Sequence, residues 1–251
     1  MQLIDIGVNF HSSQFRGLDA ELMRRASAAG VVAVLATGTS LQASRTELAL
    51  ARRHADVWST AGVHPHSAKE WDEAGAAAFE PLWADPRVVA VGECGLDYNR
   101  MFSPRDAQRR AFQAQAEAAV RHAKPLFLHC RDAFDDFRAM LRDAAAAGAH
   151  GVVHCFTDGP REAEAFLELG FDLGITGWVT DVARGGALRD ALRVIPLDRL
   201  HLETDAPYLR PRNAGKTRPY NEPALLPFVA RAVAELKGVP PEALAARATA
   251  N

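Results

Sequence analysis

The sequence predicts an α/β protein that folds as a (β/α)8 TIM barrel, with one domain spanning residues 1–251. Three observations support this fold. Short apolar runs alternate with helical patterns, eight such runs occur, and 251 residues is a typical length for one barrel. No low-complexity linker divides the chain, and 48% of its residues are hydrophobic, so we expect one large core.

The expected strands are short apolar runs, and several end at a side chain that can bind a metal ion. Their ranges are 2–6, 31–36, 57–62, 88–93, 126–129, 151–155, 171–175 and 200–204. The clearest helical patterns are 104–122 and 222–236, where apolar residues recur at helical spacing. Ser103 is expected to cap the first helix with Pro104 at its first position, and Pro227 can bend the start of the second.

Three consecutive expected strands end in an acidic residue or a histidine, namely Glu93, His129 and His154. A carboxylate at the end of an apolar strand needs a cation or hydrogen bonds, because burying it unpaired is costly. A salt bridge or a satisfied core histidine would explain any one of them, but the set indicates metal-ligand chemistry. Asp205, after the last strand, can add a ligand or accept a proton from activated water.

A cysteine follows three of these residues by one position: Cys94, Cys130 and Cys155. Because neighbours in a strand point to opposite faces, we expect the cysteines to face the helix layer as small apolar filler. Zinc-binding cysteines would instead leave the histidines against helices. Oxygen and imidazole ligands without thiolate suit Mg²⁺, Mn²⁺ or Zn²⁺, and one or two such cations can support hydrolysis.

Other polar side chains fall near the same strand ends. In the first strand, alternation places Asp5 and Asn9 on one face. After the third strand, His64 and His66 share a face of an extended segment and can hold a metal ion or a phosphate oxygen. A pair of loop histidines without a ligand is an equally good interpretation of these two residues taken alone.

A basic stretch, 208–218, follows the last strand and carries four cations and no acidic residue: Arg210, Arg212, Lys216 and Arg218. Such a loop is often only solvated, but beside a metal site it can bind phosphates. Net charge is −2, so any phosphate contact must come from a local patch of this kind. Aromatic residues in nearby loops can stack nucleobases or belong to the core: Phe102, Trp178, Tyr208 and Tyr220.

Taken in order and spacing, these motifs resemble the TatD family of metal-dependent deoxyribonucleases. They are GVHPH at 62–66, GECGLD at 92–97, LHCRD at 128–132, HCF at 154–156 and ETDAP at 203–207. In DIGVN at 5–9 and ITGWV at 175–179 the chain resembles the TatD-type members of this family more than its distant relatives. The resemblance covers nearly the whole chain. It implies a barrel of the metallo-dependent hydrolase type and a 3′-5′ exonuclease on single-stranded DNA and RNA, in DNA repair or nucleic-acid degradation.

The resemblance also implies roles for single residues. Glu93, His129 and His154 would bind a divalent cation, with Mg²⁺ favoured over Mn²⁺ or Zn²⁺. Asp205 would be a further ligand or a catalytic carboxylate, and the catalytic set would also include Glu93 and the phosphate-contacting pair His64 and His66. Contacts to the substrate phosphates and bases are expected from Asn9, Arg131, Trp178, Tyr208, Arg210 and Arg212.

One departure from the family pattern concerns the first strand. Many relatives open with Asp-x-His-x-His, whereas Gly7 and Asn9 stand at the two histidine positions here. We therefore expect one firm cation site and a second that is weak or completed by the substrate. The chain also ends at Asn251, where relatives usually continue through a short apolar tail, which suggests a shortened C-terminus.

Two other functions fit parts of the pattern. An amidohydrolase-like enzyme acting on a lactone, amide or ester would keep the barrel, but it would use His-x-His on the first strand and a modified lysine. A binding protein with a structural metal would show a closed thiolate set. Three unpaired cysteines, no leader-like start and no long apolar run favour a soluble cytoplasmic protein, expected to be monomeric and without a membrane partner.

Overall fold

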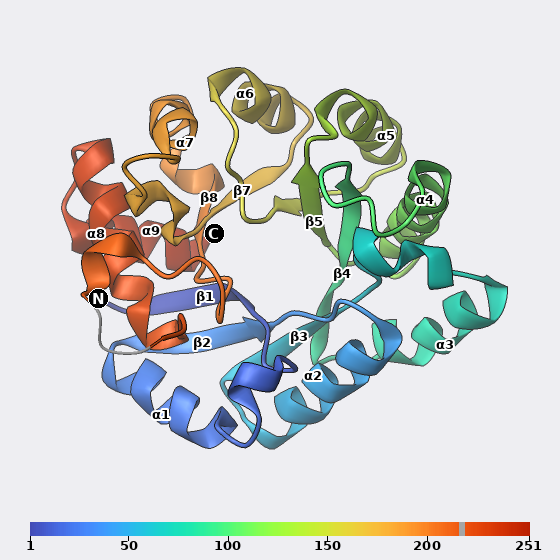
Figure 1. Cartoon of the computed structure of the whole chain (residues 1–251), viewed down its shortest axis with the longest axis horizontal. Helices are drawn as coiled ribbons and strands as arrows, with labels where there is room; N and C mark the ends of the chain where they lie inside the picture. Colours follow the sequence, from blue (N-terminus) through green and yellow to red (C-terminus); the bar gives the residue numbers. More distant parts are fainter. Residues whose placement is uncertain (216–218) are drawn as a thin grey trace. The chain divides into compact units, whose positions relative to one another are not determined.

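The computed structural model describes residues 1–215 and 219–251, in which eight strands alternate with helices and form one sheet in the order β1 to β8 (Figure 1). The strands are β1 Leu3–Val8, β2 Val31–Ala36, β3 Val57–Ala61, β4 Val88–Asp97, β5 Leu126–Arg131, β6 Gly151–Val153, β7 Asp172–Ile175 and β8 Leu200–Leu202. The helices are α1 Asp19–Ala28, α2 Leu41–Arg53, α3 Glu73–Trp83, α4 Arg105–Arg121, α5 Phe134–Ala146, α6 Pro160–Glu168, α7 Gly186–Ala191, α8 Leu226–Lys237 and α9 Pro241–Ala250. This order is the topology of a (β/α)8 barrel, which confirms the predicted fold class.

Contacts within the chain define two compact units, and each is described by itself below. The terminal unit consists of Met1–Leu35, Cys155–Leu167 and Asp172–Asn251. The central unit consists of Ala36–His154 and Glu168–Phe171. A single domain over 1–251 stays a prediction. Within the described part of the chain, no helix has both the length and the apolar character that crossing a bilayer requires.

The central unit has a core of apolar strands covered by aromatic side chains. Strands β4 and β5 pair in parallel, and Val91, Leu126 and Phe127 are fully buried. In the helix layer, Phe112 of α4 stacks on Phe137 of α5 with ring centroids 5.2 Å apart. Full burial of a ring of this size stabilises a fold by roughly 1.5–3 kcal/mol. This packing gives β4 and β5 fixed positions, and their carboxyl ends carry the polar residues described below.

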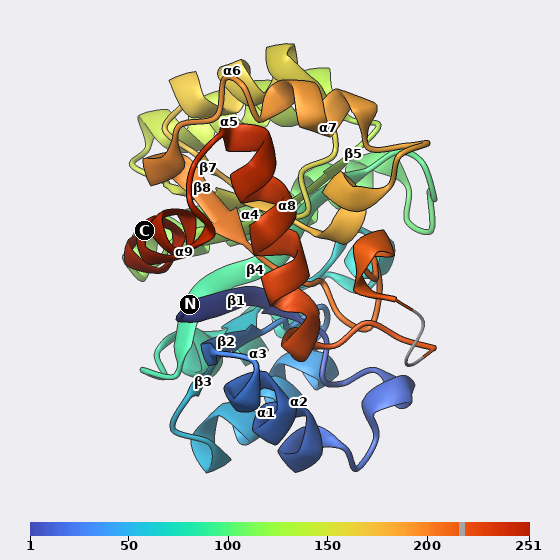
Figure 2. The same ribbon diagram turned by 90° about the vertical axis from the view of Figure 1, so that its left-hand side faces the viewer.

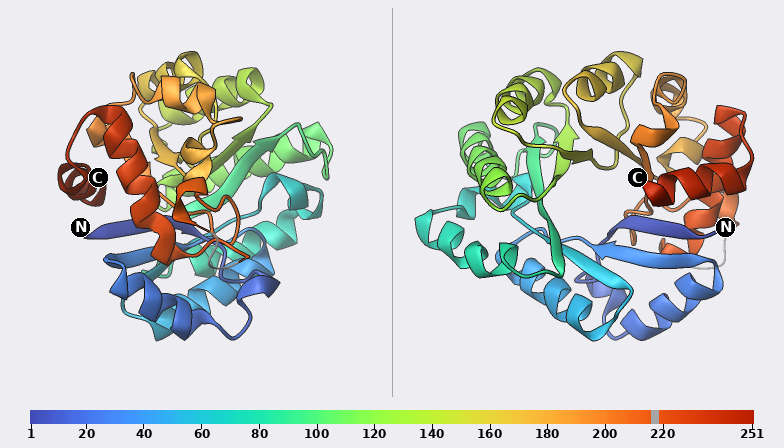
Figure 3. Two further views of the ribbon diagram at one scale, coloured as in Figure 1. Left: turned by 60° about the vertical axis from the view of Figure 1, so that its left-hand side comes forward. Right: turned by 180° about the vertical axis from the view of Figure 1, so that it is seen from behind.

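The terminal unit brings the two ends of the chain together. The segment after β8 pairs with β1 through a bridge between Val8 and Ala206, and Asn9 N donates to Ala206 O at 2.8 Å. The last helix, α9, lies beside the start of β1 (Figure 2, Figure 3), where Thr249 Oγ1 donates to Gln2 O at 3.1 Å. Pairing of the last strand with the first is the connection that a closed barrel requires.

Helix α4 begins near its predicted start, but the predicted cap was wrong. Pro104 is the residue that precedes the first turn, and no side chain caps the helix. The Ser103 hydroxyl instead donates to His66 O at 2.9 Å and accepts from Lys69 N at 3.0 Å. Ser103 therefore ties the turn before α4 to the segment that carries the histidine pair.

The helix predicted at 222–236 begins later than expected. Pro223–Leu225 forms a 3-10 turn, and α8 follows with Pro227 in its first turn. Proline fits there because the first N–H groups of a helix have no acceptor within the helix. The first predicted residues therefore belong to a separate turn.

Candidate metal centre

Glu93 projects from an irregular point of β4. The strand continues past its predicted end to Asp97, and its register with β5 shifts between Gly92 and Cys94, so Glu93 lies between the paired positions. A bulge of this kind changes the direction of a side chain. The backbone N–H of Glu93 donates to Gly38 O at 2.7 Å. Cys94 is fully buried, as expected for apolar filler, and burial raises the pKa of its thiol, whereas Cys130 and Cys155 are only partly buried.

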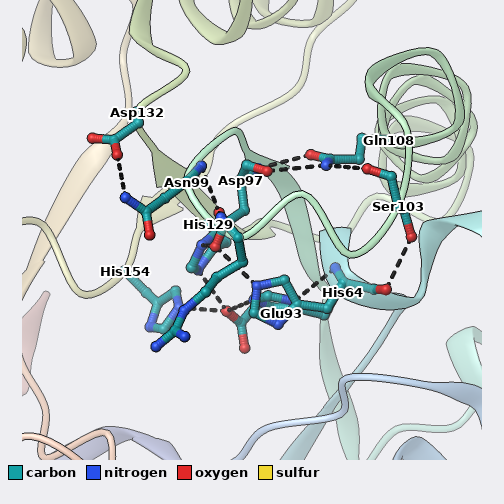
Figure 4. A network of polar contacts seen from close by, with 11 residues as sticks. His64, Glu93, Asp97, Asn99, Ser103, Gln108, His129, Asp132 and His154 are labelled. Atoms are coloured by element: carbon teal, nitrogen blue, oxygen red, sulfur yellow. Dashed lines mark hydrogen bonds and ion pairs between the residues drawn. The ribbon is translucent and has the colours of Figure 1, made fainter.

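Three imidazole nitrogens converge on one carboxylate oxygen of Glu93 (Figure 4). The distances from Glu93 Oε1 are 2.8 Å to His154 Nε2, 3.0 Å to His129 Nδ1 and 3.2 Å to His64 Nε2. Burial alone would raise the pKa of Glu93, but the imidazoles of His154, His64 and His129 bring it well below its usual range. The carboxylate is therefore ionised. Among the described residues, the ligand atoms of His64, Glu93 and His129 all lie within 4.8 Å of one another, close enough for one cation.

Asp97 belongs to the same network, although it was not predicted as a site residue. Its Oδ2 is 2.9 Å from His66 Nε2 and 3.3 Å from His129 Nε2, while its Oδ1 accepts two backbone N–H groups of the following turn. Burial alone would raise the pKa of Asp97, but the hydrogen bonds from His129 and His66 hold it well below its usual range. An ionised carboxylate only accepts, so both ring nitrogens that face it carry hydrogens.

The contact with Asp97 decides which nitrogen of His129 can bind a cation. Burial alone would lower the pKa of His129, but hydrogen bonds to Asp97 and Glu93 raise it overall. Because Nε2 donates to Asp97, Nδ1 is the nitrogen that faces the ionised carboxylate of Glu93 and donates to it, and a bound cation would take the place of that Nδ1 hydrogen. A carboxylate on the far side of an imidazole is a common way to orient a histidine ligand.

His64 has the opposite arrangement. Its Nδ1 accepts from His66 N at 3.1 Å, so the ring caps the 3-10 turn Pro65–Glu70. Burial lowers the pKa of His64 to about 4, and the ring is therefore neutral at pH 7 with a single hydrogen. Since Nδ1 accepts, that hydrogen is on Nε2 and is donated toward Glu93. His64 therefore faces Glu93 through Nε2, whereas His129 faces it through Nδ1.

Asp205 and Asn9 lie in the terminal unit and contact each other. Asn9 Nδ2 donates to Asp205 Oδ1 at 3.0 Å, and Asn9 is buried. A Cβ atom on Gly7 would lie 2.4 Å from Glu203 Oε2, so the space in which a histidine at position 7 would begin is filled by a carboxylate. Glycine at position 7 thus leaves room for the carboxylate of Glu203. A role for Asp205 as a ligand or as a catalytic carboxylate stays a prediction.

Two of the predicted aromatic and basic substrate contacts are partly engaged within the terminal unit. The guanidinium of Arg184 lies 4.3 Å from the ring centre of Trp178. Arg212 Nη2 is 3.4 Å from Asp181 Oδ2, so part of its charge is balanced. Tyr208, by contrast, is 53% exposed. Arg212 is thus less available for a phosphate than the composition of the loop suggests, because Asp181 faces it.

The remaining predicted phosphate contacts are spread over both units. Arg210 Nη2 is 3.5 Å from Ala214 O within the same loop. Arg131 is exposed at the end of β5 in the central unit. Lys216 and Arg218 lie outside the described residues. The contacts predicted from Asn9, Arg131 and this loop stay predictions.

Asp5 is a buried acid whose ionisation should affect stability. Its carboxylate accepts from Thr204 N and Thr204 Oγ1, and burial raises its pKa from 3.8 to about 8. Between these values the folded state keeps a proton that the unfolded state releases, so the free energy of unfolding falls as pH rises from about 4 to about 8. Asp5→Asn mimics the protonated acid and removes this dependence.

We expect the stability of Asp5→Asn relative to the unmodified protein to increase by a few kcal/mol between pH 5 and pH 8.5, on the order set by the linkage relation. Urea denaturation followed by circular dichroism at the two pH values measures this difference. Asp198→Asn, a change at an exposed aspartate of the same unit, is the control. If the free energy of unfolding varied with pH in the same way for Asp5→Asn and the unmodified protein, the raised pKa of Asp5 would be contradicted.

Comparison with known proteins gives one consistent result. The model of the family described as TatD related DNase matches residues 4–251. The chain is 48% identical over 252 aligned positions to the 3′-5′ ssDNA/RNA exonuclease TatD of Erwinia billingiae, covering 99% of this chain and 97% of that protein. For the protein of the same description from Rahnella, the identity is 49% over 247 positions, with 97% and 94% covered.

Solved structures show the same fold. A TatD homologue from Escherichia coli K12 superimposes with a TM-score of 0.88 at 28% identity, covering 98% of this chain and 94% of that one. A TatD family hydrolase from Entamoeba histolytica gives a TM-score of 0.89 at 24% identity, with 100% and 96% covered. At that identity, the second likeness concerns the fold alone.

Proposed function

The chain belongs to the family of TatD-related DNases and is a nuclease, and from that premise we propose that it removes nucleotides from the 3′ end of single-stranded DNA and also acts on RNA. The observation that carries the proposal is the convergence of three imidazoles on the ionised carboxylate of Glu93. The names of relatives that share about half of their residues with this chain support the substrate and the polarity. Such an activity would serve DNA repair or nucleic-acid degradation.

The donor set fits a divalent cation. We assign the ion to Glu93, to Nδ1 of His129 and to His154, whose Nε2 faces the same carboxylate oxygen. His64 shares the compact group of Glu93 and His129 and lies beside this position. Carboxylate and imidazole donors without thiolate suit Mg²⁺, Mn²⁺ or Zn²⁺, and we favour Mg²⁺ from the family resemblance. A bound cation would supply positive charge against the charge that develops on a phosphodiester during hydrolysis. Asp205 would add to a second, weaker position.

The other residues of the centre orient the histidine rings or donate hydrogen bonds. Asp97 holds His129 through Nε2 and His66 through Nε2, which fixes the planes of both rings. His64 keeps its hydrogen on Nε2, where it can be donated to a phosphate oxygen instead of to Glu93. We therefore assign His64 to phosphate binding and Asp97 to positioning the rings of His129 and His66. His66 contacts both Asp97 and the ring of His64.

The proposal is tested with a 5′-labelled single-stranded oligonucleotide. We expect a ladder that shortens from the 3′ end with Mg²⁺, Mn²⁺ or Zn²⁺, and no shortening when a chelator removes the cation. A 3′-labelled oligonucleotide should lose its label in the first cleavage, which distinguishes exonuclease from endonuclease action. An RNA of the same sequence should be shortened as well.

A panel of esters, lactones and amides serves as the opposing test. If the protein hydrolysed any of these and left the oligonucleotide intact with every metal tried, it would be an amidohydrolase-like enzyme and the proposed exonuclease function would be wrong. Binding of a cation with no turnover of either kind of substrate would favour a structural metal.

A further inference from the structure

Phe102 is 56% exposed in the turn 98–103, next to the metal centre. Its ring centroid lies 4.8 Å from that of His66, with the planes at 67°. The preceding residue, Met101, is 43% exposed. Single exposed apolar residues are common, so exposure alone assigns nothing. Two further features set this ring apart, namely how firmly its turn is held and what lies beside it.

The turn that carries the ring is anchored on several sides (Figure 4). Ser103 Oγ donates to His66 O at 2.9 Å, and Gln108 Nε2 donates to Ser103 O at 2.9 Å and to Asp97 O at 3.0 Å. Gln108 Oε1 in turn accepts from Asp97 N at 2.8 Å. Asp97, whose carboxylate contacts the rings of His66 and His129, therefore also holds the turn through its backbone N–H and C=O groups. An apolar ring on a fixed turn loses little conformational entropy when a ligand covers it.

The ring is also close to the phosphate donor assigned above. The ring of His66 contacts the rings of both Phe102 and His64, with centroids 4.8 Å and 4.2 Å away respectively. The base of a nucleotide is separated from its phosphate by one sugar. A phosphate that accepts from His64 Nε2 therefore brings a neighbouring base within reach of the exposed ring. Arg100, in the same turn, is exposed and adds positive charge beside this position.

We propose that Phe102 is the surface on which a nucleobase next to the cleaved phosphodiester stacks. The ligand class is any nucleobase at the 3′ end of a single strand, because every base presents an aromatic face to such a ring. This inference rests on the proposed nuclease function and adds a base-binding position to it. It explains how a chain with net charge −2 can hold a strand end beside a small cluster of donors.

The test compares oligonucleotides that carry either a normal base or an abasic site at the last or the penultimate 3′ position. For Phe102→Ala we expect KM for the normal strand to rise roughly 5- to 100-fold, the range that the loss of one base–aromatic stack corresponds to. For the unmodified protein, KM should rise by a similar factor on one of the two abasic strands. For Phe102→Ala, KM on that strand should be close to its KM on the normal strand, since the base and the ring act through the same contact. Phe102→Trp should restore the low KM.

Val120→Ala removes an exposed apolar side chain from α4 of the same unit and is the matched control. Mn²⁺ binding measured by calorimetry should be unchanged in Phe102→Ala, which separates loss of stacking from damage to the centre. If the unmodified protein shortens the normal strand and Phe102→Ala does so with the same KM, the stacking proposal is wrong while the nuclease function stands. If the unmodified protein shortens no strand under any metal, the proposed function itself fails.

Discussion

Glu93→Gln is expected to reduce the rate of strand shortening by roughly 10³-fold or more, the range found when one preorganised charged group is removed from a hydrolytic site. The substitution keeps the shape of the side chain but removes the negative charge that faces three imidazoles. Glutamine also presents an amide NH₂ group where a cation needs an oxygen. Cation affinity should therefore fall together with the rate. The measurements are shortening of a 5′-labelled strand and calorimetric titration with Mn²⁺.

Glu117→Gln makes the same chemical change on the exposed face of α4 and should leave both quantities unchanged. Circular dichroism melting curves establish that both variants are folded. Retention by Glu93→Gln of cation affinity and of a rate within tenfold of the unmodified protein would show that the carboxylate is structural and that the centre lies elsewhere.

Gly95→Ala is expected to lower the free energy of unfolding by about 3–5 kcal/mol, because it combines a strained backbone with a steric clash. Gly95 has φ near +141°, and a Cβ atom there would lie 2.0 Å from His129 O. The two residues are register partners in β4 and β5. Relief of the clash must move His129, so activity should fall as well. Chemical denaturation and the strand-shortening assay measure the two effects.

Gly148→Ala separates the two causes of the expected loss. Gly148 also has a positive φ, of +97°, but a Cβ atom added there would meet no described atom within 4 Å. Its cost should be limited to backbone strain, about 1–2 kcal/mol, and its activity should be unchanged. Equal losses of stability in the two variants would mean that β4 and β5 can separate locally without cost to the fold.

Much of the fold is predictable from the sequence because each strand is a short apolar run between polar turns. The expected strand ranges agree with β1 to β8 to within two residues at most ends. The main exception is β4, which continues to Asp97 through a bulge. Apolar pattern does not reveal a bulge, because the extra residue changes register with the neighbouring strand and not local composition. Ser103 was misassigned for a similar reason, since its acceptor lies 37 residues away in the sequence.

The sequence predicted which residues form the candidate site better than it predicted what each of them does. Glu93, His129 and His154 were identified because they end successive apolar strands. Asp97 was missed, although it follows Glu93 by four residues in the same motif, because its partners become visible only when β4 and β5 are paired. The nitrogen that faces Glu93 is Nε2 in His64 and Nδ1 in His129, and this choice depends on a backbone amide and on a carboxylate, respectively.

The order of residues alone therefore determined the alternating architecture, the family and the set of metal-competent side chains, since these depend on periodicity and on motifs that are local in the chain. Only the tertiary structure decided which nitrogen of each histidine faces Glu93, and which apolar ring lies exposed beside them. Those features depend on contacts between segments that are distant in sequence, and hydrogen-bond direction is set by the partner a group meets and not by its own identity.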